Sequence, residues 1–194
     1  SNTELTKLLG ATNLRFGESG VQAADITFQT TLVPNGIALV EVNTSGSVIL
    51  DDAGTDTALK SNESPIFEIN ADSGIEAQQA YNGFAEISGG GQIHLTVTGS
   101  SSIGSGANPI QFNSGQDDVV IDAGSGAVVL STISTAGSTL SVGAITLTGA
   151  GTVDIKATGD LTAAGNISVV GVGGTIELSA DRDEIGVGAL NINA

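Results

Sequence analysis

Short stretches in which apolar residues alternate with polar or small ones run through most of this chain, and glycine-rich segments separate them. A period of two is typical of a β-strand that buries one face. The β-branched residues and closely spaced glycines oppose long helices. The sequence therefore predicts an all-β protein with strands at 37–42, 66–69, 93–97, 145–147, 153–155, 167–169, 176–178 and 190–192.

A coarser repeat joins these strands in the C-terminal third, where strand centres return to the same phase after 22 to 24 residues. The Gly- and Ser-rich segment 100–107 interrupts the pattern. A repeat of this length with three short strands per period is the expected unit of a β-solenoid, in which each coil stacks its apolar residues on the next. The related positions are Ile145 and Ile167, Val153 and Ile176, Leu161 and Ile185, Ile167 and Leu190, and, upstream, Val97 and Val120.

These patterns predict a parallel β-solenoid over 21–194 with coils of about 22 residues. Residues 21–114 are less regular, 115–194 are more regular, and 1–20 are expected to form an N-terminal cap. Short helices are expected from Thr3 to Leu9 and from Ile75 to Tyr81. About eight or nine coils stacked at about 4.8 Å would give a rod on the order of 40 Å long. An antiparallel β-sandwich remains the alternative, because short strands separated by turns fit that fold as well.

The charge balance excludes several classes of partner. The chain carries 21 Asp and Glu against 5 Lys and Arg, for a net charge of -16, and only 3% of its residues are aromatic. Nucleic acid is not an expected partner, because binding it requires cations and usually stacking aromatics. Membrane insertion is not expected either, because no apolar run approaches the roughly 20 residues of a spanning helix. The absence of Cys removes thiolate chemistry and cysteine-ligated zinc.

One segment carries a family resemblance. Residues 147–170 have the sequence Leu-Thr-Gly-Ala-Gly-Thr-Val-Asp-Ile-Lys-Ala-Thr-Gly-Asp-Leu-Thr-Ala-Ala-Gly-Asn-Ile-Ser-Val-Val. This segment resembles the degenerate repeats of filamentous-haemagglutinin-like bacterial exoproteins, and similar runs at 118–135 and 174–180 extend the likeness over roughly 115–194. The resemblance implies a right-handed parallel β-helix in a secreted or surface-anchored adhesin. It implies no catalytic residues.

The predicted function is therefore that of a non-catalytic structural or adhesive module of a secreted or cell-surface bacterial protein. Its partners would be host-cell, matrix or polysaccharide surfaces, met by exposed polar loops. The open strand edge expected near Leu190 to Ile192 also predicts end-to-end self-association.

The alternative is a carbohydrate-active β-helix enzyme, either a polysaccharide lyase or a hydrolase. Such enzymes place carboxylates along a groove as acid, base or calcium ligand. Asp118 and Asp122 are four residues apart around an apolar run, so a regular strand would project both to the same side. His94, the only histidine, is expected to lie on the polar face of its strand, and no Gly-x-Ser-x-Gly elbow accompanies it.

No cofactor is expected other than calcium, which takes several carboxylate and carbonyl oxygens. Calcium would stabilise turns and would not take part in catalysis. The second of two acidic clusters begins like an EF-hand loop, but Ile185 stands where a third oxygen ligand belongs. The clusters are Asp51, Asp52 and Asp56 in one turn, and Asp181, Asp183 and Glu184 in the other.

Overall fold

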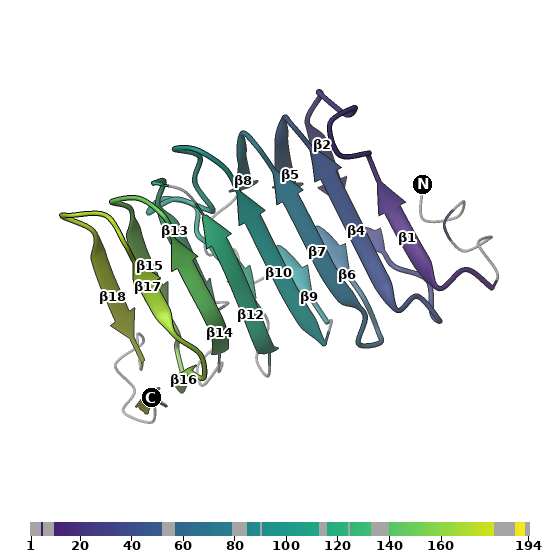
Figure 1. The fold of residues 1–194 in the computed structure, drawn as a ribbon. Helices are drawn as coiled ribbons and strands as arrows, with labels where there is room; N and C mark the ends of the chain where they lie inside the picture. Colours follow the sequence, from purple (N-terminus) through teal and green to yellow (C-terminus); the bar gives the residue numbers. More distant parts are fainter. Residues whose placement is uncertain are drawn as a thin grey trace.

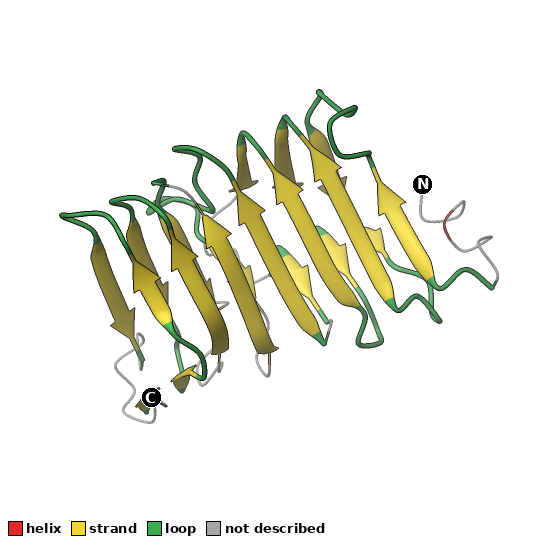
Figure 2. Ribbon diagram, in the orientation of Figure 1, coloured by secondary structure: helices red, strands yellow, loops and turns green. Residues whose placement is uncertain are grey.

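A computed structural model describes residues 5, 10–51, 57–78, 85–89, 91–112, 116–123, 125–132, 140–180 and 189–192. Within them the chain winds into a stack of coils, and strand is almost the only regular secondary structure (Figures 1 and 2). The stack has about six turns, about 26 residues apart. The predicted all-β solenoid is confirmed. The antiparallel sandwich is wrong, because the strand pairings in the described part of the chain are parallel.

One wall of the solenoid is a nine-stranded sheet, here called the long sheet, that runs from the first coil to the last. Strand β17 (Ile167–Val169) lies off the main path of this sheet and pairs with the C-terminal part of β14. The other strands follow in sequence order, each on the next: β1 (Asn13–Phe16), β4 (Leu39–Thr44), β7 (Ile66–Ala71), β10 (Gln92–Val97), β12 (Gln116–Ala123), β14 (Leu140–Leu147), β16 (Leu161–Ala163) and β19 (Leu190–Ile192).

Two smaller sheets form the remaining walls. The three-stranded sheet contains β2 (Ile26–Gln29), β5 (Ser47–Asp51) and β8 (Gly74–Ala77). Isolated bridges through Ile103 connect its last strand to β13. The seven-stranded sheet contains β3 (Thr31–Leu32), β6 (Leu59–Lys60), β9 (Ile87–Ser88), β11 (Ile110–Phe112), β13 (Val128–Thr132), β15 (Thr152–Lys156) and β18 (Thr175–Ser179).

The handedness of the coil follows from the path of the chain in Figure 1. The chain rises along a strand of the long sheet, crosses behind at the top, descends along the other walls and returns to the front one strand further on. Because it advances from the N-terminal end at the right to the C-terminal end at the left, the coil is right-handed. Parallel crossover connections are almost always of this hand.

The coil length was predicted correctly only near the C-terminus. Ile145 pairs with Ile167 and Val153 with Ile176, as expected. Leu161 pairs with Leu190 and not with Ile185, and the long-sheet partner of Leu190 is Leu161 and not Ile167. Upstream the step is longer than predicted, so the solenoid has about six turns and not eight or nine.

The longer upstream step is clearest along the long sheet. Leu14 pairs with Val40, Val40 with Phe67, Phe67 with Ile93 and Ile93 with Val119, which are steps of 26 or 27 residues. The predicted match of Val97 with Val120 is therefore wrong. The hydrogen-bond register fixes only the strands, so the turns between them can hold extra residues. About six turns at about 4.8 Å span roughly 30 Å.

Columns of apolar side chains fill the interior. The column that starts at Leu14 in the long sheet continues through Val40, Phe67, Ile93, Val119 and Val142, all buried. Burying one such side chain stabilises the fold by about 1.5–3 kcal/mol. The core is therefore made of contacts between consecutive coils.

The two predicted helices have different outcomes. Ile75 begins no helix: residues 74–77 form β8, with Ile75 and Ala77 buried and Glu76 exposed, which is the alternation of a strand. The rest of that prediction, from residue 79 onward, lies outside the described residues. The same is true of residues 3–9 except Leu5, which packs against the core. No helix within the described ranges is long and apolar enough to span a membrane.

Candidate functional site

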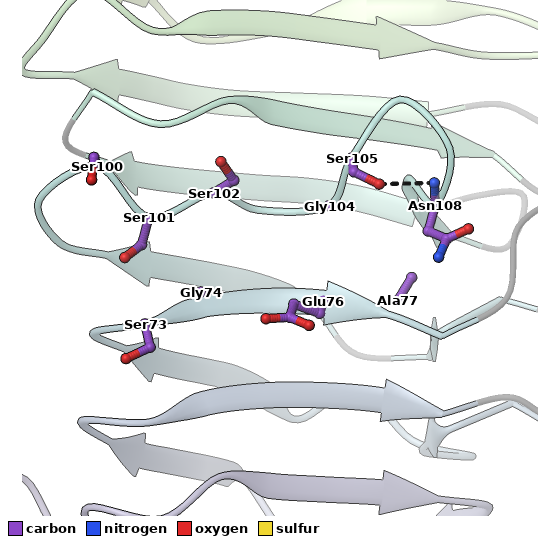
Figure 3. Close-up of a pocket in the computed structure, with 10 residues that line it drawn as sticks. All are labelled: Ser73, Gly74, Glu76, Ala77, Ser100, Ser101, Ser102, Gly104, Ser105 and Asn108. Carbon is purple, nitrogen blue, oxygen red and sulfur yellow. Dashed lines mark hydrogen bonds between the residues drawn. The ribbon is translucent and has the colours of Figure 1, made fainter.

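A polar groove of about 530 Å³ opens between the third and fourth coils, on the outer side of β8. Figure 3 shows how its residues lie: one side is β8, and the other is the chain that leaves β10 and loops away before β11. We call it the serine groove. It is lined by Ser73, Gly74, Glu76, Ala77, Ser100, Ser101, Ser102, Gly104, Ser105 and Asn108.

The groove exists because the three-stranded sheet loses a strand in the fourth coil. The Ile75 N–H donates to the Ser102 carbonyl at 3.0 Å, and the Gly104 N–H donates to the Ile75 carbonyl at 2.8 Å. The chain then turns away. Gly104 has a φ of +65°, and a Cβ added there would lie 2.5 Å from the carbonyl oxygen of Val129. Only glycine fits this position without strain, so Gly104 ends the pairing and starts the loop to Asn108.

The floor of the groove exposes an incomplete strand edge. The Gln78 N–H donates to the Leu50 carbonyl of the preceding coil at 3.1 Å, whereas the Ile75 N–H points to the fourth coil. The alternation of a parallel ladder therefore directs the N–H and C=O of Ala77 toward the fourth coil as well. Among the described residues of that coil, no strand lies opposite Ala77. The groove thus has one backbone donor and one backbone acceptor at its base.

Neighbouring backbone groups hold the serine hydroxyls in place. The Ser73 hydroxyl donates to the Ser45 carbonyl at 2.8 Å, and the Ser101 hydroxyl donates to the Asp72 carbonyl at 2.6 Å. Both hydroxyls keep lone pairs with which to accept further bonds.

Two other hydroxyls have the opposite role. Ser105 Oγ accepts from the Asn108 N–H at 3.0 Å, the bond drawn in Figure 3. Ser102 Oγ accepts from the Ala127 N–H of the next coil at 3.0 Å, and its side chain points away from β8. Their own protons are available for donation. The groove therefore offers the Ser101 hydroxyl as a fixed acceptor and the Ser105 hydroxyl as a fixed donor.

Glu76 gives the groove its charge. It is exposed on the outer face of β8, and its Oε1 accepts from the Ser47 hydroxyl at 3.1 Å. Asp72 lies at the rim, where its Oδ1 accepts from the Thr98 hydroxyl at 3.2 Å. The ten lining residues include no Lys, Arg or His. The groove therefore repels anions such as phosphate, sulfate and uronate.

The predicted calcium clusters fall mostly outside the described residues. Asp52, Asp56, Asp181, Asp183 and Glu184 all do. Asp51 is described: it ends β5 and accepts a hydrogen bond from the Gln29 side-chain amide. In the part of the chain that the structure describes, no three acidic or histidine side chains gather in a group that could hold a metal ion. Calcium binding stays a prediction, which thermal melting in calcium against matched magnesium would test.

The acidic pair proposed for an enzyme lies on one strand, β12. Val119 and Ile121 are buried, so Asp122 is on the outer face and exposed, whereas the side chain of Asp118 lies outside the described part. Four residues of strand separate two Cα atoms by about 13 Å. The paired carboxyls of glycosidases are about 5–9.5 Å apart. This spacing does not favour joint acid–base work by Asp118 and Asp122.

His94 belongs to an outward column of polar and charged residues on the long sheet. It lies between the buried Ile93 and Leu95, and its register partner is Glu68, which in turn pairs with Glu41. Glu41 completes the column with an ion pair to Arg15, whose Nη2 is 2.7 Å from Glu41 Oε2.

Two neighbours lower the pKa of Glu41. The Asn43 side-chain amide donates to Oε1 at 2.7 Å, and the Arg15 Nε donates to Oε2 at 2.8 Å. Together, with Asn43 the larger cause, they hold the pKa of Glu41 below its ordinary value of 4.5.

Sequence reasoning missed the serine groove. The one sequence feature that coincides with the groove is the Gly- and Ser-rich segment 100–107, which was interpreted only as a break in the repeat. Comparison of the chain with protein-family models, curated proteins and solved structures finds no match.

Proposed function

We propose that this chain is a non-catalytic structural and adhesive module of an exported bacterial surface protein. The observation that supports this most is the unbroken stack: the long sheet passes from β1 to β19 through parallel neighbours, over the apolar columns described above. In such a stack, stability is roughly the sum of coil energies and contacts between adjacent coils. The stack is suited to hold its outer surfaces in fixed positions.

The outer surfaces provide the adhesive part of the proposal. They carry polar and acidic groups at fixed spacing, among them the Arg15–Glu41–Glu68–His94 column and the serine groove. Host-cell, matrix or polysaccharide surfaces are the proposed partners. The bacterial and extracellular assignment rests on the resemblance of the repeats to filamentous-haemagglutinin-like exoproteins.

The last coil supports a role in further stacking. Ile176, in register with the buried Val153, is 45% exposed, and Ile192, in register with the buried Ala163, is 65% exposed. Apolar residues exposed at the edge of a strand stack are suited to associate with another strand layer. End-to-end self-association is therefore part of the proposal.

Adhesion is tested with beads that carry the full chain. The beads are passed over immobilised neutral polysaccharide, anionic polysaccharide, extracellular-matrix protein and cultured host cells, and retention is compared with that of beads carrying an unrelated acidic protein. Retention on at least one surface is expected. No retention on any of them, together with turnover of a polysaccharide that Asp122→Asn abolishes, would replace the proposal with the enzyme.

A further inference from the structure

We propose that the serine groove is a binding site for an uncharged saccharide. This inference rests on the proposed adhesive function and names the ligand class for one of its surfaces. The groove volume of about 530 Å³ lies within the range of about 300–1,000 Å³ that is usual for small-ligand sites.

The lining chemistry matches sugar hydroxyls, each of which donates and accepts. Ser101 can accept, while Ser105 can donate. The Asn108 side chain, drawn toward the groove in Figure 3, adds an amide with both functions. A hydroxyl-rich ligand can therefore satisfy several fixed groups at once.

The carboxylate of Glu76 favours neutral sugars over anionic ones as ligands of the groove. With one oxygen held by Ser47, its carboxylate can accept from two adjacent sugar hydroxyls, an interaction stronger than one between neutral groups. The same charge and that of Asp72 disfavour sulfated sugars and uronates, because no cation lines the groove. A basic peptide would meet only one lining carboxylate, whereas a saccharide would meet the hydroxyls of Ser101 and Ser105 and the Asn108 amide as well. The saccharide is therefore favoured.

The affinity of a single groove should be weak. The lining contains no aromatic ring on which a sugar could stack, so a Kd of about 1 mM is expected. Many copies on one surface raise the effective affinity by about 10²–10⁴-fold, which is sufficient for adhesion.

The test is an NMR titration of the full ¹⁵N-labelled chain, to about 10 mM ligand. The ligands are neutral oligosaccharides of glucan, mannan, galactan and chitin type, an oligouronate, and oligolysine. At least one neutral oligosaccharide is expected to shift the amide signals of residues 73–77 and 100–108 and few others. The oligouronate is expected to leave them unchanged.

Substitutions check that the groove itself binds. Glu76→Gln and Ser105→Ala are each expected to weaken saccharide binding about fivefold or more. Glu177→Gln, an exposed glutamate on β18, is the matched control and should leave binding unchanged. Spectra of the free variants establish that each is folded.

Three outcomes overturn the inference: no groove signal moves with any neutral saccharide, the shifts survive both groove substitutions, or only oligolysine moves the groove signals. The bead assay separates this failure from that of the adhesive function. Beads that adhere equally well with Glu76→Gln overturn the groove and leave adhesion standing. Groove shifts without adhesion on any surface overturn adhesion and leave the groove standing.

Discussion

The first and last coils of the solenoid both pair in parallel with their neighbours, but their apolar side chains lie in different environments. In the first coil, Leu14 and Phe28 are only 7% and 2% exposed, Phe28 makes an edge-to-face contact with Phe16 at 5.0 Å between ring centroids, and Leu5 packs against the core. In the last coil, Ile176 and Ile192 are 45% and 65% exposed. The comparison shows that strand alternation alone does not bury an apolar side chain. The side chain must also be covered by the neighbouring coils of the stack.

The largest expected effect is a contrast between a central and a terminal core residue. Phe67 is fully buried between two coils, so Phe67→Ala is expected to lower the free energy of unfolding by about 3–5 kcal/mol. Ile176→Ala, at the open end, is expected to cost less than about 1 kcal/mol. Denaturant titration of both variants checks this, and equal losses would show that the last coil is packed in solution.

Two glycines with positive φ provide the next contrast. Gly104→Ala would place its Cβ 2.5 Å from the Val129 carbonyl oxygen, and should cost about 1–3 kcal/mol. Gly173, near the open end, has a φ of +90° with nothing within 4 Å of an added Cβ, so Gly173→Ala should cost about 1 kcal/mol from backbone strain alone. Melting temperatures measure both. A smaller loss at Gly104 would mean that the loop moves to make room.

The difference between the two ends also predicts how the chain associates. Replacing Ile176 and Leu190 together by Glu should raise the dissociation constant of any self-association at least tenfold, or about 1.4 kcal/mol. Val21→Glu is the control, because Val21 is an exposed apolar residue in a turn near the first coil. Sedimentation velocity over a concentration series makes the measurement. Equal weakening by Val21→Glu would place the contact elsewhere.

The smallest expected loss of stability comes from removing the ion pair between Arg15 and Glu41 in the first coil. Because the pKa of Glu41 is lowered in the folded state, its contribution is fully present above its ordinary pKa of 4.5 and is lost as the pH falls through the lowered value. Arg15→Gln should therefore cost about 0.2–1 kcal/mol at pH 7 and less under strongly acidic conditions. Denaturant titrations of Arg15→Gln and the unchanged protein, at pH 7 and under strongly acidic conditions, measure how this cost changes with pH. A cost that grows on acidification would contradict it.

The sequence predicted the fold class because strand alternation is a local signal, written into residues such as Ile93, Leu95 and Val97. Coil length was less predictable, because the register constrains strands and leaves turn length free. The helix expected from Ile75 failed because Ile75 stacks on Val48, a contact that no local pattern contains.

The serine groove could not have been predicted from the pattern of the chain. It depends on Gly104 leaving the sheet at a positive φ and on the absence, among the described residues of the fourth coil, of a strand opposite Ala77. Both are properties of neighbouring coils. The Ser- and Gly-rich composition of 100–107 indicates where in the sequence the groove lies, but it does not predict the shape of the groove.

The loop that begins at Gly104 has a consequence for how such a molecule can vary. The chain departs from one wall and returns at β11 in register with β9 and β13, so the coils on either side are undisturbed. Residues could be gained, lost or exchanged between these two points at little cost to the scaffold. A lineage could therefore alter what the surface recognises while it inherits the same framework, with the two traits under separate selection.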